Sequence, residues 1–148
     1  MDERVKRIKT PEKCEIFAKN ATDRGRPDLA LEAKHHALAL RAQEFGAESE
    51  AENMALQAIY AYEEVLSKNN GKKTKASKTW QMIKKYGIIP TVDRVVNRTD
   101  ESRAYTALIE LGLEDFAFEA VILKYPKSFS SNALAKSKER MNEWKSPK

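Results

Sequence analysis

The chain has 148 residues, a formal net charge of +5 and a sequence pI near 9.2. Hydrophobic residues make up 41% and charged residues 33%, with only five glycines and five prolines, which is typical of a folded, helix-rich protein. No apolar run approaches the roughly 18 to 20 residues of a membrane helix, and no apolar stretch of a secretory signal follows the charged N-terminus. The sequence therefore predicts a cytoplasmic protein with no membrane partner.

The length fits one domain of common size. We expect a flexible basic segment over residues 1–9 and a single helical domain over residues 10–145. The only cysteine, Cys14, cannot form an internal disulfide, which suits a reducing compartment. We interpret Cys14 as a small apolar residue of the first helix, because no histidine accompanies it in a nucleophile motif.

The N-terminal part predicts two helices separated by a turn. Thr10 and Pro11 are a cap and a first-turn proline for a helix that ends near Gly25, and Pro27 opens a second helix that ends at Gly46. Apolar residues lie on two sides of the second helix, which indicates that it is packed on both sides. The pair resembles a single tetratricopeptide-like hairpin, but no repeat recurs at a fixed period, so it is interpreted as an antiparallel helix pair.

Charge is segregated in the middle of the chain. A third helix, predicted over residues 47–69, carries no Lys or Arg up to residue 67, but it has five acids: Glu48, Glu50, Glu52, Glu63 and Glu64. Between Lys68 and Arg98 the balance is reversed, with nine Lys or Arg and one acid, Asp93. Such segregation creates a local positive field that attracts polyanions.

Residues 77–98 predict a candidate helix-turn-helix, in which a tight turn at Gly87 joins two short helices. Apolar and polar residues of the first helix follow helical spacing. Its inward face is expected to carry Trp80, Ile83 and Tyr86. Its outward face is expected to carry Lys78, Gln81 and Lys85.

The second of these helices is predicted to start at Pro90 and to bury a stripe of three valines: Val92, Val95 and Val96. On the opposite face, at spacings of three and four, lie Thr91, Arg94 and Arg98. A helix that exposes polar and cationic side chains after such a turn has the geometry that reads a major groove.

The string YGIIPTVDRVVNR is similar to the turn and recognition helix of lactose-repressor-type DNA-binding headpieces, whose second helix carries a comparable TV-x-RVVN string. This resemblance implies that Thr91, Arg94 and Asn97 lie at or near a DNA groove and that Lys84 and Lys85 lie near phosphates. The turn of this chain is shorter than that of the family, a proline stands where the family has a polar residue, and the segment is internal.

The rest of the chain is also helical in pattern. Thr99 begins a helix that ends at Gly112, residues 114–124 form another, and Ser130 or Ser131 caps the last. Neither a β-hairpin turn nor an alternating run of β-branched residues is present. We therefore predict an all-α fold, a compact bundle of about seven or eight helices including the candidate helix-turn-helix.

No pattern indicates a catalytic centre. His35 and His36 are adjacent, so on a helix they point about 100° apart and do not ligate one metal together. The carboxylate pairs Glu63–Glu64 and Asp115–Glu119 would suit a metal-dependent nuclease only if several carboxylates converged, and helical carboxylate pairs are common. We predict no catalytic residue, no metal site and no cofactor.

The preferred hypothesis is a non-catalytic nucleic-acid-binding protein, with duplex DNA as its partner. Its candidate contacts are Lys72, Lys73, Lys75, Lys78, Thr79, Lys84, Lys85, Thr91, Arg94, Asn97 and Arg98. One alternative is a helical scaffold protein that forms a homodimer, with the acidic third helix against the basic segment of another copy. The metal-dependent nuclease is another. A solvated loop beside an ordinary valine core would account for the same residues without any nucleic acid.

Overall fold

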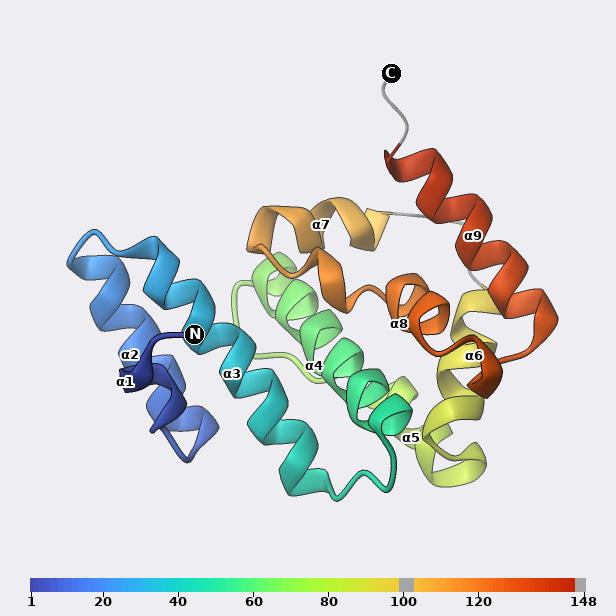
Figure 1. The fold of residues 1–148 in the computed structure, drawn as a ribbon, viewed down its shortest axis with the longest axis horizontal. Coiled ribbons are helices and arrows are strands. Elements are labelled where there is room, and N and C mark those ends of the chain that lie inside the picture. Colours follow the sequence, from blue (N-terminus) through green and yellow to red (C-terminus); the bar gives the residue numbers. More distant parts are fainter. Residues whose placement is uncertain (99–102, 146–148) are drawn as a thin grey trace. The chain divides into compact units, whose positions relative to one another are not determined.

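The computed structural model describes residues 1–98 and 103–145, and these residues form nine α-helices and two short 3-10 helices without a β-strand (Figure 1). The predicted all-α class is confirmed for this part of the chain. The chain divides into two compact units, Met1–Ala47 and Glu48–Lys148. The predicted domain over residues 10–145 therefore includes parts of both units.

The first unit is an antiparallel helix pair preceded by one short helix. The predicted start signals act as expected: the Thr10 hydroxyl accepts a hydrogen bond from the Lys13 N–H at 3.2 Å. The predicted stop at Gly46 is also confirmed, since this glycine adopts a left-handed conformation with φ of 93°. The helices of this unit are α1 (Glu3–Lys6), α2 (Pro11–Asp23) and α3 (Pro27–Phe45).

The core of the first unit is built largely from small residues, which allow α2 and α3 to approach closely. It contains Val5, Ala18, Ala21, Leu29, Ala30 and Ala33, with Phe17 packed against them. Residues 1–9 are predicted to be flexible, but Val5 of this segment is fully buried. The His36 ring also reaches this segment, with its Nε2 atom 2.9 Å from the Ile8 carbonyl oxygen.

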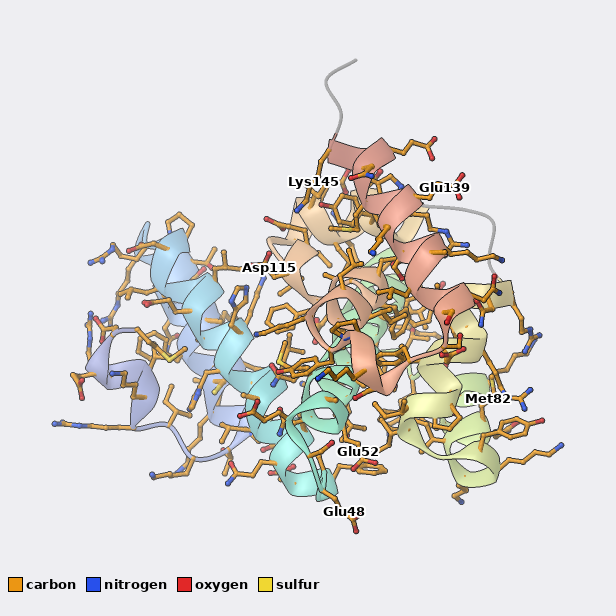
Figure 2. The ribbon with its side chains drawn as sticks, turned by 45° about the vertical axis from the view of Figure 1, so that its right-hand side comes forward. Glu48, Glu52, Met82, Asp115, Glu139 and Lys145 are labelled. Atoms are coloured by element: carbon orange, nitrogen blue, oxygen red, sulfur yellow. The ribbon has the colours of Figure 1, made fainter. Side chains whose placement is uncertain are left out.

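The second unit is built on α4 (Glu50–Asn70), whose start is fixed by a capping box (Figure 2). The Ser49 hydroxyl accepts a hydrogen bond from the Glu52 N–H, and the Glu52 carboxylate accepts one from the Glu48 N–H at 2.9 Å. These bonds explain why the helix begins after Ser49 and not at residue 47. Glu52, one of the acids that make the segment negative, thus also helps to define where α4 starts, whereas Glu48 contributes only its backbone N–H.

The other elements of this unit are α5 (Ser77–Tyr86), α6 (Ile88–Arg98), α7 (Arg103–Leu111), the 3-10 helix Glu114–Phe116, α8 (Phe118–Lys124), the 3-10 helix Pro126–Ser128 and α9 (Ser131–Lys145). The single helix predicted over residues 114–124 is wrong. Ala117 has extended backbone with ψ of 144°, which separates the first 3-10 helix from α8. The predicted cap at Thr99 lies outside the described residues.

Helix α4 contacts α6, α7 and α8, while α9 packs on α6 and α8 (Figure 1). Leu56, Ile59, Val92 and Ile122 are fully buried in this unit. Among the residues that the structure describes, no helix has the length and apolar character needed to cross a membrane.

Candidate nucleic-acid interface

The start of α5 is fixed to α4 by hydrogen bonds. The Glu63 carboxylate accepts one from the Ala76 N–H at 2.8 Å and one from the Trp80 indole N–H at 2.7 Å. One turn further along α4, the Ser67 hydroxyl accepts a hydrogen bond from the Thr74 N–H at 2.8 Å. Glu63 therefore helps to position α5, although it belongs to the acidic helix.

The two faces of α5 are those predicted from its sequence. Ile83 is buried, Trp80 and Tyr86 are half-buried, and the Trp80 ring lies 5.2 Å from that of Tyr60. The outward face is exposed and carries Lys78, Gln81, Lys84 and Lys85. Because α5 contains no acid, this exposed face is cationic along its whole length.

The turn between α5 and α6 is made by one residue, Gly87, whose backbone has φ of 94° and ψ of 172°. This conformation favours glycine, because a Cβ atom makes positive φ costly. Helix α6 starts immediately afterwards at Ile88, two residues before the predicted Pro90. Pro90 is tolerated in the first turn, where an N–H group has no intrahelical acceptor in any case.

Thr91 lies in the interior, so its assignment as a groove contact is wrong. Its side chain is fully buried, and its hydroxyl donates a hydrogen bond to the Gly87 carbonyl oxygen at 2.7 Å. A threonine whose hydroxyl is satisfied by its own helix can be buried much as a valine is. Because α4, α5, α8 and α9 all contact α6, its buried face is wider than the valine stripe alone predicts.

Asn97 is also held within the fold. Its amide nitrogen donates to Asp93 at 2.8 Å, and its amide oxygen accepts from the Asn132 side chain at 2.9 Å. Asp93 in turn accepts hydrogen bonds from the backbone N–H and the hydroxyl of Ser130, at 2.7 and 2.9 Å. The Lys136 ammonium donates to the Asn97 carbonyl oxygen at 2.6 Å. We call these five residues the α6–α9 clamp.

The two arginines of α6 remain on the surface. Arg94 and Arg98 are exposed and lie one turn apart. The Arg94 guanidinium lies over the Tyr86 ring at 3.8 Å from its centroid, and the Lys85 ammonium lies 5.2 Å from the same centroid. Tyr86 therefore brings cations of α5 and α6 together, a role that its predicted inward position does not indicate.

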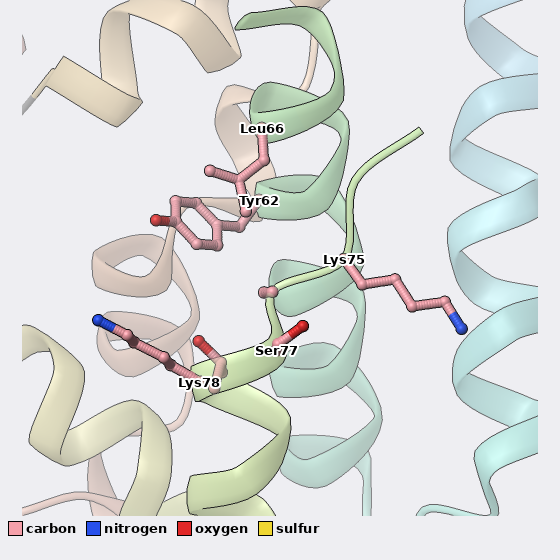
Figure 3. A pocket seen from close by; sticks show the side chains of 7 residues that line it. Tyr62, Leu66, Lys75, Ser77 and Lys78 are labelled. Atoms are coloured by element: carbon pink, nitrogen blue, oxygen red, sulfur yellow. The ribbon is translucent and has the colours of Figure 1, made fainter. Parts of the chain in front are cut away.

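The cations at the beginning of the basic segment do not all converge. Lys72, Lys73 and Lys75 are exposed on the connection between α4 and α5. Figure 3 shows that Lys75 and Lys78 point in opposite directions. Lys78, Lys84, Lys85, Arg94 and Arg98 are exposed on α5 and α6, and we call these five residues the α5–α6 cationic face. The three lysines of the connection lie outside this group.

A pocket of about 280 Å³ lies where α5 begins (Figure 3). Tyr62 and Leu66 of α4 form its apolar wall, and residues 75–79 form the remainder, including the half-buried Thr79. The residue that precedes α5 is Ala76, which has no polar side chain to cap the helix. The first N–H groups of a helix carry partial positive charge, but at this end of α5 the Glu63 carboxylate, which accepts a hydrogen bond from the Ala76 N–H, offsets that charge.

Two of the carboxylates considered for catalysis are engaged in structural contacts. Glu119 is paired with Arg140 at 2.9 Å, with both side chains about one tenth exposed, and Glu63 holds the start of α5. Within residues 1–98 and 103–145, no group of three or more His, Cys, Asp or Glu side chains is arranged to hold a metal ion. Comparison with protein-family models, with curated proteins and with solved structures finds no match to this chain.

Proposed function

We propose that this protein binds nucleic acid, and duplex DNA in particular, through the α5–α6 cationic face, without catalysing a reaction. The observation that supports this proposal is the state of five cations: Lys78, Lys84, Lys85, Arg94 and Arg98. All five are exposed, and no carboxylate among the described residues forms an ion pair with them. The same proposal includes a cytoplasmic location, where Cys14 stays reduced.

The physical basis is the release of counterions. Each phosphate that a lysine or arginine neutralises frees condensed cations. For each such contact, the logarithm of the binding constant falls by about 0.9 for every tenfold rise in salt concentration. If all five side chains contact phosphates, the logarithmic salt slope is about −4 to −5. The Arg94 and Lys85 side chains are already oriented by Tyr86, which reduces the side-chain entropy lost on binding.

The proposal is tested by fluorescence anisotropy with labelled duplex and single-stranded probes at low salt. The double variant Lys84→Glu/Lys85→Glu reverses two charges of the cationic face, and we expect it to lose duplex binding while far-UV circular dichroism stays unchanged. The matched control is Lys138→Glu/Lys145→Glu, which changes the net charge equally at two exposed residues of α9. Equal loss of binding in both variants, or no binding by the native protein, would contradict the proposal.

A homodimer is a second candidate, and the exposed acids at the start of α4 favour it. Glu48 and Glu50 are exposed and carry charge opposite to that of the α5–α6 cationic face. A second copy would then occupy the same cations as DNA does, so dimer and DNA complex would compete. Light scattering at low and high ionic strength tests this version, and a strict monomer at every protein concentration would remove it.

A further inference from the structure

The packing of α6 bears on what kind of nucleic-acid contact the protein can make. A recognition helix lies in the major groove and presents the side chains of its N-terminal part to the base edges. The N-terminal residues of α6 are Ile88, Ile89, Pro90 and Thr91. Two of these are buried, and Thr91 is the only one with a polar side chain. No hydrogen-bonding side chain is therefore available at the end of α6 that would enter a groove.

The amide of Asn97 is equally unsuited to reading bases. Asparagine recognises adenine when its amide donates one hydrogen bond and accepts another. In this structure the amide nitrogen is bonded to Asp93 and the amide oxygen to Asn132. These two bonds fix the orientation of the amide between Asp93 and Asn132, so turning it toward a base would cost at least one of them.

What α6 leaves exposed is a single line of three residues, Pro90, Arg94 and Arg98, spaced four apart. Proline has no side-chain donor, and the guanidinium of Arg94 lies over the Tyr86 ring. The exposed residues of α5 that flank this line are chiefly lysines, which contact phosphates as point charges. The surface thus offers five cations to phosphates, whereas its exposed side chains able to reach base edges are chiefly Gln81 of α5 and the two arginines of α6.

We infer that the protein contacts the sugar–phosphate backbone of duplex DNA and binds it independently of base sequence. This inference rests on the proposed function and specifies it: the substrate is the duplex backbone and not a particular operator sequence. It also departs from the resemblance to lactose-repressor-type headpieces, which implies reading by Thr91, Arg94 and Asn97. The backbone amides and side chains that position such a helix on DNA carry no sequence information by themselves.

The test uses the full chain and two measurements. Affinities for duplexes of equal length and unrelated sequence are measured by anisotropy, and a randomised duplex library is taken through rounds of selection and sequenced. We expect the affinities to agree within about threefold, since a specific site binds at least a thousandfold more tightly than other DNA. We also expect the selected pool to contain no enriched motif.

A matched pair of variants separates backbone binding from groove reading. Thr91→Val keeps the shape of a buried side chain, and we expect it to leave affinity within about twofold of the native value for every duplex. Arg94→Ala removes an exposed cation, and we expect it to weaken binding to all duplexes by the same factor.

An enriched motif, or a loss confined to one sequence, would overturn the inference while leaving nucleic-acid binding intact. Failure of the native protein to bind any duplex would instead overturn the proposed function, and the inference with it.

Discussion

Helices α5 and α9 are both basic, but their cations have different surroundings. On α9, the Lys136 ammonium donates to the Asn97 carbonyl oxygen at 2.6 Å and Arg140 is paired with Glu119. On α5, the three lysines Lys78, Lys84 and Lys85 are exposed. A basic helix therefore indicates a binding surface only when its cations lack acceptors within the fold.

The difference follows from what each helix packs against. Helix α9 lies on α6 and α8, which present a carbonyl group and a carboxylate to it. Helix α5 packs chiefly on α6 and buries Ile83, and its lysines remain exposed. We therefore expect substitution of Lys136 or Arg140 in α9 to change stability, and substitution of the exposed lysines of α5 to change binding.

The largest effect is expected for Arg140→Met. Glu119 would remain buried without its partner, and breaking a buried ion pair costs about 3–5 kcal/mol of the free energy of unfolding. Urea denaturation followed by circular dichroism measures this loss. Lys138→Met is the matched control, because it removes an exposed cation of the same helix and should cost about 0.5 kcal/mol or less. Equal losses would show that Arg140 has no special role.

A second substitution tests the α6–α9 clamp. Asp93→Ala removes the acceptor for Asn97 and for two groups of Ser130, and we expect a loss of about 2–3 kcal/mol in the free energy of unfolding. The control is Asp115→Ala, which removes an exposed carboxylate from the same unit. If both variants denature at the same urea concentration, the clamp does not hold α6 against α9.

The local parts of this structure can be predicted from the sequence. The cap at Thr10, the stop at Gly46 and the inward face of α5 depend on residues within a turn or two of one another, and all three are confirmed. The break at Ala117 is not signalled, because the residues around it have ordinary helical spacing. Local pattern therefore determines most helix ends, but not every interruption.

The candidate site was harder to predict, because its polar residues depend on distant partners. Asp93 and Ser130 are 37 residues apart, and nothing in the periodicity of α6 indicates that they meet. The same applies to Thr91, whose burial depends on how many helices surround α6. Exposed lysines need no partner, so their positions follow from helical spacing alone. The exposure of the cations on α5 and α6 thus follows from local spacing, whereas the burial of Thr91 and the hydrogen bonds of Asn97 do not.

A third prediction compares single cations of the two helices in DNA binding. Lys84→Ala should reduce the steepness of the logarithmic salt dependence by about 0.9, the value for one lost phosphate contact. Lys138→Ala, an equal change of charge on α9, should leave the slope unchanged. Anisotropy titrations over a series of salt concentrations measure both. A shallower slope for Lys138→Ala would extend the binding surface onto α9.

A fourth prediction concerns the contact that joins α5 to α6. Replacing Tyr86 with leucine keeps an apolar side chain but removes the ring under the Arg94 guanidinium, which is worth about 0.5–1 kcal/mol at an exposed site. A double-mutant cycle with Arg94→Ala isolates this energy from the other effects of each substitution. A coupling energy of zero would mean that Tyr86 does not orient Arg94.

The smallest effect is expected at high pH, where the α9 side of the unit contains a titrating group. Tyr105 stacks on Trp144 of α9 with ring centroids 4.3 Å apart, and burial, followed by the charges of Glu114 and Asp115, raises the pKa of its phenol. The folded state then keeps its proton at a pH where the unfolded chain, with a phenol pKa of about 10, releases it. The resulting stabilisation is complete below pH 10 and is lost as pH rises through the folded-state value. Urea denaturation over an alkaline pH series measures this effect, and the native protein should lose stability relative to Tyr105→Phe as pH rises. If the difference in free energy of unfolding between the two proteins is the same at every pH, the phenol titrates alike in the folded and unfolded states.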